Sequence, residues 1–235
     1  MYGLVLRATI PPFLVASAAA SFASPARAEA QTGGSPTITL GAATQQVGKG
    51  AGQTRGEPTV FAALRTGRGP LYASASANTV RLGPGGEGEA NLTVGARSKA
   101  AGFEGHAGVH LMQRLGAEEG FDGRWVEYEV GVSRALGRAS AALIVNYSPD
   151  ADGPAREAWW NQALVAWGLT DASRISAAVG RRTADGGGDY NAWNIGFTHR
   201  TPAGAAFDVR FLDTDKHEFG GEFGRRLVGT LSHTF

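Results

Sequence analysis

The sequence lacks cysteine and has little of several features that usually narrow the class of a protein. Among its 235 residues there are no Cys and only two Met, so no disulfide framework is possible. The formal net charge is only +1, so nothing steers the chain toward nucleic acid. After residue 30, no apolar run reaches the roughly 18 residues that a membrane-spanning helix needs. Beyond the N-terminus, these absences argue against a disulfide-rich domain, a nucleic-acid-binding protein and a helical membrane protein.

The N-terminal segment, residues 1–30, differs from the rest of the chain. It has an early arginine, an apolar stretch over 8–20 and small residues that lead to Ala26-Arg27-Ala28. This is the pattern of a secretory signal with an A-x-A cleavage site. A pair of prolines and the short apolar core argue against the alternative, a membrane-anchoring helix. We therefore expect residues 1–28, or two residues more, to be a cleaved signal peptide, and 29–235 to be the exported domain.

The exported part alternates in polarity with a period of two. In the segment 89–97, for example, Leu92 and Val94 share one face while Glu89 and Thr93 share the other. Strict alternation over eight or more residues predicts strands rather than helices. It predicts about twelve strands of roughly 8–11 residues, the length that a tilted strand needs to cross a bilayer. The segments are 37–44, 59–65, 70–78, 89–97, 102–111, 125–133, 139–147, 158–168, 173–182, 191–199, 205–213 and 226–235.

The connections between these segments alternate between short and long. The short ones are 66–70, 98–102, 134–138, 168–172 and 200–204, and the long ones are 45–58, 80–88, 113–123, 148–157, 182–190 and 214–226. Bacterial outer-membrane barrels have this asymmetry, with short periplasmic turns and long outer loops. None of the ten prolines interrupts the interior of a predicted strand. Together these patterns predict an all-β fold, a transmembrane antiparallel up-and-down β-barrel.

The final segment, "RRLVGTLSHTF" at 225–235, alternates up to an aromatic last residue. We expect this strand to close the barrel against the first one, with Leu227, Leu231 and Phe235 facing lipid and Phe235 in the interfacial aromatic girdle. The pattern resembles the recognition signal for outer-membrane barrel assembly, although His233 replaces a bulkier aromatic residue. The alternative, a soluble sandwich that ends at phenylalanine, fits the export signal and the turn asymmetry less well.

Four stretches of the sequence resemble the TorF family of porin-like outer-membrane proteins. They are "KGAGQTRGEPTVFAAL" (49–64), "LYASASANTV" (71–80), "NYSPD" (146–150) and "FLDTD" (211–215). In order along the chain, they extend the resemblance over nearly all of the exported part. Lys49 stands where the family usually has arginine. The resemblance implies an outer-membrane barrel with a channel role and supplies no catalytic residue and no substrate.

Candidate metal and phosphate sites do not hold up on spacing. His106 and His110 are four residues apart, which on a strand separates them by roughly 13 Å, too far to share an ion. We expect both to line the lumen. The acidic segments 185–189 and 213–218 lack the spacing of a calcium loop and are interpreted as solvated loops. The segment 83–88 lacks the Lys-Ser/Thr of a phosphate loop, so we expect no cofactor and no metal.

The sequence also gives no support for catalysis. No Gly-x-Ser-x-Gly motif occurs. A lipid-face hydrolase would need a serine and a histidine within reach of each other. The outward histidines His199 and His233 lie on strands that are not neighbours, so we expect that the protein is not an enzyme.

Charged residues expected inside the barrel fall into two groups. The acidic group is Glu89, Glu104, Glu127 and Glu129 on the fourth to sixth strands, and the basic group is Arg174, Arg182 and Arg210 on the ninth to eleventh. In a ring of about twelve strands these groups lie opposite each other. Two residues depart from the division. They are Asp208, among the bases, and Arg97, among the acids, which we expect to pair with Glu104.

The acidic group leaves two possibilities for the lumen. Like charges as close as those of Glu127 and Glu129 resist joint ionisation unless water or a base compensates, and water in an open lumen would do so. In the alternative, the arginines cross the lumen, pair with the acids and plug it.

We interpret the protein as a porin-like channel for passive diffusion of small polar solutes. Its expected partners are outer-membrane lipid and the barrel-assembly machinery, with no nucleic acid. The alternatives are a non-conducting structural or adhesive barrel and an outer-membrane hydrolase. Twelve strands lie between filled eight-strand barrels and open sixteen-strand porins, so strand number leaves the state of the lumen open. The balanced total charge predicts weak ion selectivity.

Overall fold

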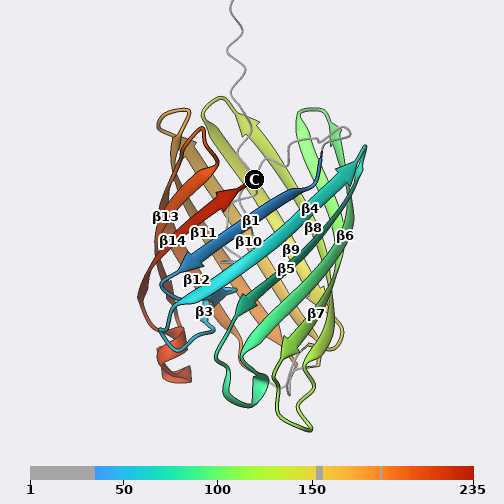
Figure 1. The fold of residues 1–235 in the computed structure, drawn as a ribbon, viewed down its shortest axis with the longest axis vertical. Helices are drawn as coiled ribbons and strands as arrows, with labels where there is room; N and C mark the ends of the chain where they lie inside the picture. Colours follow the sequence, from blue (N-terminus) through green and yellow to red (C-terminus); the bar gives the residue numbers. More distant parts are fainter. Residues whose placement is uncertain (1–34, 152–155, 186) are drawn as a thin grey trace, which may run out of the picture.

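The described part of the chain forms one closed antiparallel β-barrel of twelve strands (Figure 1). The computed structural model describes residues 35–151, 156–185 and 187–235, so the predicted signal peptide, 1–28, lies outside the described residues. The barrel strands are β1 (Thr37–Ala43), β4 (Thr59–Arg68), β5 (Leu71–Thr79), β6 (Gly88–Ala100), β7 (Phe103–Leu115), β8 (Arg124–Leu136), β9 (Ala139–Ser148), β10 (Ala158–Gly168), β11 (Ser173–Ala184), β12 (Tyr190–Arg200), β13 (Ala205–Thr214) and β14 (Arg226–Thr234). The predicted up-and-down barrel of about twelve strands is confirmed.

The strands on one side of the barrel are longer than the alternation of polarity predicts. β6, β7 and β8 each have 13 residues. The predicted connection 98–102 is mostly strand, because Ala101 and Gly102 alone make the turn between β6 and β7. Both have positive φ, 51° and 79°, as a type I′ hairpin turn requires. The hydrogen-bonded ladder therefore continues past the last apolar position up to the turn.

The first and last strands close the barrel. Thr39 of β1 pairs with Thr234 of β14, and their hydroxyl oxygens are 2.9 Å apart. Beyond the strand, the backbone N–H of Phe235 donates a hydrogen bond to the carbonyl of Ile38 at 2.9 Å. The predicted closure of the last strand against the first is confirmed.

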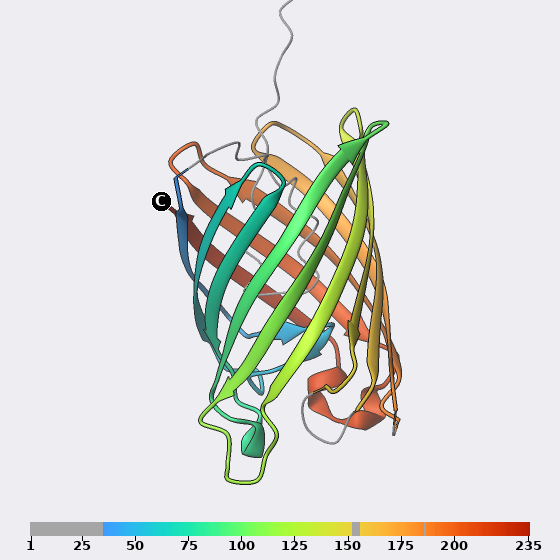
Figure 2. The ribbon, with the colours of Figure 1, turned by 90° about the vertical axis from the view of Figure 1, so that its right-hand side faces the viewer.

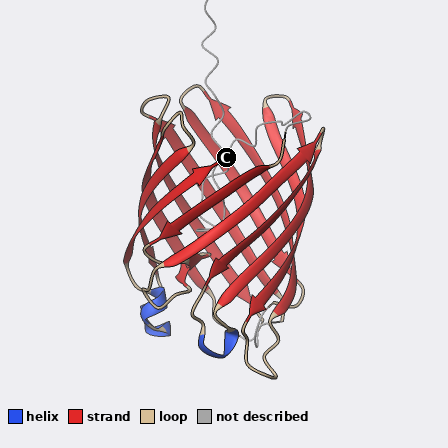
Figure 3. Cartoon of the chain, in the orientation of Figure 1, coloured by secondary structure: helices blue, strands red, loops and turns tan. Residues whose placement is uncertain are grey.

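The two ends of the barrel differ, as the loop lengths predict. Figures 1 and 2 show the tight turns at the end where Phe235 lies, and the longer loops at the other. The short 3₁₀ helices η1 (Gly83–Gly85), η2 (His217–Phe219) and η3 (Gly221–Phe223) all lie at the long-loop end (Figure 3). No helix in the described ranges has the length and hydropathy needed to span a membrane.

Large apolar side chains cover the outside of the barrel. Val94, Val130 and Val179 are 54%, 55% and 60% exposed, although each lies in the middle of a strand. Leu227 and Phe235 of the seam are 64% and 68% exposed. Such side chains are costly in water, so this surface is suited to contact with lipid hydrocarbon.

Candidate functional site: the barrel lumen

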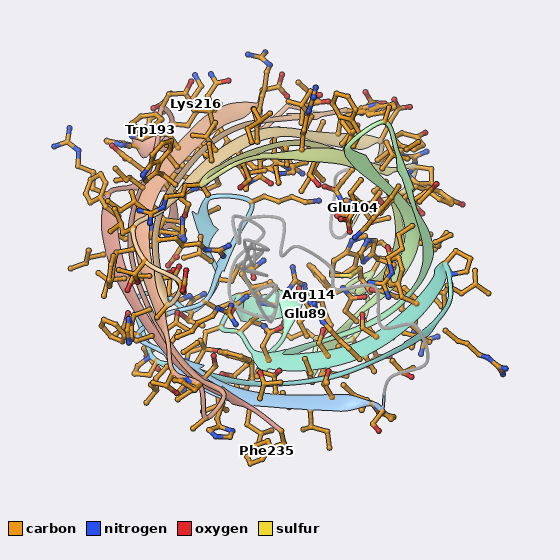
Figure 4. The ribbon with its side chains drawn as sticks, turned by 90° about the horizontal axis from the view of Figure 1, so that it is seen from above. Glu89, Glu104, Arg114, Trp193, Lys216 and Phe235 are labelled. Atoms are coloured by element: carbon orange, nitrogen blue, oxygen red, sulfur yellow. The ribbon has the colours of Figure 1, made fainter. Side chains whose placement is uncertain are left out.

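The inward positions of the strands carry most of the polar and charged side chains. Figure 4 looks down the barrel and shows Glu89, Glu104 and Arg114 inside the ring of strands, whereas Trp193 and Phe235 point away from it. The inward side chains are half-buried or buried, and their neighbours along each strand are exposed on the apolar outside. The lumen is therefore the only face of the described barrel wall where charges are concentrated in reach of one another.

Each predicted lumen acid has a basic partner in the structure. Arg114 of β7 pairs with Glu89 of β6. Lys99 Nζ lies 3.3 Å from Glu104 Oε2. Arg210 Nη2 lies 3.1 Å from Asp208 Oδ2. The remaining two predicted acids, Glu127 and Glu129, lie on β8 and are held in different ways.

Glu129 lies at the centre of a polar cluster that joins four strands, β6 to β9. His106 Nε2 is 3.0 Å from one carboxylate oxygen, and the amide of Asn146 donates to the other at 2.9 Å. His110 Nε2 lies 3.9 Å from that second oxygen, and its Nδ1 is 2.9 Å from the hydroxyl of Thr93. The two histidines thus flank one carboxylate. The alternation of polarity placed Thr93 on the polar face with Glu89 but gave no sign of its contact with His110, and Asn146 was not predicted as a lumen residue.

Glu127 is held by a segment that folds into the barrel. Its carboxylate pairs with Lys49, at the tip of a hairpin made of β2 (Val47–Gly48) and β3 (Ala51–Gly52). Lys49 and Gly50 form the tip with positive φ values of 49° and 88°. Figure 4 shows this hairpin, in pale blue, inside the ring of strands. The hairpin connects β1 to β4, and β5, β6 and β7 separate β4 from β8, so Lys49 reaches an opposing wall.

An apolar cluster anchors the base of this hairpin. Val47 is 1% exposed and packs in a cluster that includes Trp160, Leu212 and Val228 from β10, β13 and β14. The ring of Tyr190 lies 6.2 Å from that of Trp160. This cluster fills part of the lumen next to β10–β14. The hairpin is therefore fixed at one wall by apolar packing and at the other by one ion pair.

The compensation of Glu127 and Glu129 corrects the expectation from their crowding. Lys49 forms an ion pair with Glu127 and His106 Nε2 lies 3.0 Å from Glu129, so their closeness is not an argument for a water-filled lumen. Besides water, a base could compensate these two carboxylates. Lys49 is such a base, and it lies on a loop whose fold the sequence did not indicate.

Arg210 does not cross the lumen. Its guanidinium donates hydrogen bonds to Asn194 of the adjacent β12 at 2.5 Å and to Ser176 of β11, one strand further, at 3.1 Å, in addition to Asp208. Arg182 donates to the carbonyl of Gly188 at 3.2 Å. The arginine plug considered from the sequence is therefore not what the described residues form.

Glycines of the inner face allow large side chains to lie flat on the wall. A Cβ added to Gly196 would lie 2.6 Å from Cζ of Arg210, and one added to Gly131 would overlap the ring of His106. The same holds at further inward glycines, namely Gly41 under Phe61, Gly95 under Tyr72 and Gly180 under Trp160. Each bulky group occupies the space of a missing side chain on the next strand, and so projects less toward the barrel axis.

Two other expectations about charge are wrong. Arg97 does not pair with Glu104, because the register sets Arg97 opposite His106 and sets Lys99 opposite Glu104. Asp213 is not part of a solvated loop. Its carboxylate is 6% exposed and lies 2.7 Å from His217 and 3.4 Å from Arg225.

A serine and a histidine meet on the outer face. Ser173 Oγ lies 2.8 Å from His199 Nδ1, because the register of β11 and β12 places these residues opposite each other. The sequence argument considered only pairs of histidines and missed this contact. Within the described ranges, no carboxylate or amide is bonded to the other ring nitrogen of His199, as a catalytic triad would require. Among the same residues, no group of three His, Cys, Asp or Glu side chains is placed to hold a metal ion.

The barrel is similar in fold to several outer-membrane porins and channels. The KdgM porin has a TM-score of 0.61 and 9% sequence identity, over 85% of this chain and 99% of that one. The NanC porin has a TM-score of 0.57 and 9% identity, over 86% and 99%. An outer membrane channel from Pseudomonas putida F1 has a TM-score of 0.53 and 11% identity, over 85% and 95%. No protein-family model and no curated protein matches the chain.

Proposed function

We propose that this chain is an outer-membrane channel through which small polar solutes diffuse passively. The observation that carries the proposal is the arrangement of the wall. Its outside is apolar, its inside is charged, and large inward side chains such as Arg210 and His106 lie flat over glycines. A barrel built for structural support alone would not need polar side chains held away from its axis.

The fold neighbours support solute passage. One KdgM structure is a complex with disordered oligogalacturonate, and this chain has a TM-score of 0.62 to it at 9% identity. That solute belongs to KdgM. For this chain it supports only the idea that a barrel of this fold admits small polar molecules.

Outer-membrane lipid and the barrel-assembly machinery are the proposed partners. The segment 1–28 would direct export, and Leu227, Leu231 and Phe235 would present the assembly signal on the outside of β14. The four stretches that resemble the TorF family support the proposal that the chain is a member of it. A folded barrel in the outer-membrane fraction, with heat-modifiable migration on gels, is the expected result. Recovery of the mature chain as a soluble periplasmic monomer would refute this location.

Single-channel recording tests the channel directly. Purified mature protein in phosphatidylcholine bilayers should give discrete conductance steps in 1 M KCl. The same sample, unfolded by heat before addition, serves as the control. A barrel that is folded by heat-modifiability but gives no steps would support the non-conducting structural alternative.

The pair Ser173–His199 keeps an outer-membrane hydrolase as a second candidate. The two side chains are in hydrogen-bond reach on the exposed face. The porin and channel neighbours named above do not favour it. Hydrolysis of a short-chain ester that is lost in Ser173→Ala, while conductance is retained, would establish it.

A further inference from the structure

The lumen carries more positive than negative charge, although the whole chain is nearly neutral. Each of the five predicted lumen acids has a basic partner, namely Glu89–Arg114, Glu104–Lys99, Glu127–Lys49, Glu129–His106 and Asp208–Arg210. The lumen has more basic residues than these five pairs contain. Within the described ranges, Arg97 and Arg174 have no carboxylate within ion-pair distance, and Nε of each is buried without a hydrogen-bond partner.

From this imbalance we propose that Arg97 and Arg174 make the channel selective for small anions, which they bind transiently in passage. The inference rests on the proposed channel function and deepens it by naming the class of solute. It differs from the expectation of weak selectivity, which followed from the net charge of +1 for the entire sequence. Exposed acidic residues of the loops, such as Glu57, Asp189 and Glu218, contribute to that total.

The two arginines lie on separate walls near the same end of the barrel. Arg97 is close to the end of β6, which runs to the turn at 101–102, and Arg174 is the second residue of β11, directly after the turn at 169–172. On one side of the ring, β7, β8, β9 and β10 separate their strands. A solute that leaves through the short-turn end passes between them.

The surroundings of Arg174 are positively charged. Arg200 of β12 and Arg210 of β13 interact with it electrostatically, and Asp208 is the carboxylate that acts on all three. Asp208 also accepts a hydrogen bond from Thr198 at 2.6 Å. Asp208 thus acts on Arg174 while it is paired with Arg210, which leaves hydrogen-bond donors of Arg174 for an incoming anion.

Arg97 is held against the opposite wall by contacts that do not neutralise it. Its guanidinium carbon lies 5.9 Å from the ring centroid of Tyr72, and Nη2 would lie 3.1 Å from a Cβ on Gly67 of β4. Aromatic and glycine contacts orient the guanidinium and leave its charge uncompensated. Arg65 lies two residues before Gly67 on the same face of β4.

Such charges act strongly inside a narrow pore. Walls of low dielectric constant focus the field, so cations are excluded and anions are concentrated. One unit charge about 8 Å away in water changes the local concentration of a monovalent ion by roughly twofold. At about 0.1 M salt the Debye length is about 10 Å, and at 1 M it is about 3 Å, so the effect should fade with added salt.

Reversal potentials in a KCl gradient test the proposal. The wild-type protein in neutral phosphatidylcholine bilayers should favour chloride over potassium at low salt. Arg97→Gln and Arg174→Gln should each lower the permeability ratio by roughly twofold, and the double variant by roughly fourfold. Arg68→Gln is the matched control, because Arg68 lies at the short-turn end of the barrel, as Arg97 and Arg174 do, but on the exposed outer face of β4. An unchanged ratio in the double variant, or a wild-type preference for potassium, would overturn the selectivity.

Anion binding is measured separately, so that this proposal and the channel function can fail independently. In detergent, inorganic phosphate should raise the melting temperature of the wild-type barrel above that in KCl of equal ionic strength, and should not do so in the double variant. With conductance absent, this difference would uphold the anion site and refute the channel. With conductance absent and no phosphate effect, both proposals are refuted. Heat-modifiability confirms that each variant is folded.

Discussion

Removing the ion pair that ties the inner hairpin to β8 should widen the pore. Lys49→Met keeps a side chain of similar length and removes the charge that pairs with Glu127. Val47 remains packed in the apolar cluster, so the base of the hairpin should stay in place. The tip of the hairpin can then move away from the opposite wall, so that the hairpin no longer spans the lumen.

The magnitude follows from the exposure of the two side chains. Lys49 is 28% and Glu127 12% exposed, so the pair lies between fully exposed pairs, which contribute about 0–1 kcal/mol, and buried ones, whose disruption costs about 3–5 kcal/mol. A net contribution of about 1.5 kcal/mol corresponds to roughly a tenfold change in the ratio of displaced to fixed hairpin. Single-channel records of Lys49→Met should therefore show the higher-conductance state with roughly tenfold greater occupancy relative to the lower one.

Two further variants make this test specific. The exchange Lys49→Glu with Glu127→Lys restores the pair with reversed polarity and should restore the wild-type record. Arg81→Gln removes an ion pair with Glu57 in which both side chains are about half exposed, 52% and 55%, and should leave the record unchanged. Identical occupancies of the higher-conductance state in wild type and Lys49→Met would refute the proposal that the hairpin narrows the pore. Failure of the charge exchange to restore the wild-type occupancy would also refute it.

Three other outcomes are expected. Val94 is 54% exposed on the outer face, and Val94→Arg should lower the free energy of unfolding in lipid by about 2–4 kcal/mol. Ser76→Arg, at a half-buried inward position, should lower it clearly less; equal losses would mean that the assigned faces are wrong. Gly131→Val should push the ring of His106 off the barrel wall and reduce conductance. Gly105→Val is the control and should not, because the nearest neighbour of a Cβ at Gly105 would be 3.8 Å away; equal conductances would argue against flat packing. Phe235→Ala should lower the yield of heat-modifiable barrel in the outer membrane, and an unchanged yield would remove this residue from the assembly signal.

The alternation of polarity was sufficient to predict the strands, because an apolar outer face and a polar inner face impose a strict period of two. It also indicated that Glu129 and His106 share a face. It could not give the register between strands, since a shift of two residues leaves every side chain on the same face. For that reason Arg97 was paired with Glu104, which the register instead sets opposite Lys99.

The inner hairpin could not be predicted from the sequence, for a different reason. β2 and β3 have two residues each, too few for a periodic pattern. The position of Lys49 depends on packing of Val47 against side chains from β10, β13 and β14, which are far away along the chain. The signal for flat packing was present as the 35 glycines of the sequence, but only the neighbouring strand shows what each of them accommodates.

The seam between β1 and β14 has a consequence for how the barrel can form. Thr39 and Thr234, which meet there, are 195 residues apart, whereas β4 and β5 are joined by a two-residue turn. Closing a loop of that length costs roughly 5 kcal/mol of chain entropy, which the seam recovers only when its ladder is complete. Hairpins can therefore accumulate as an open sheet whose two outer strands expose unpaired backbone N–H and C=O groups. Such free edges readily pair with other chains, so an unclosed intermediate needs protection from self-association until β14 meets β1.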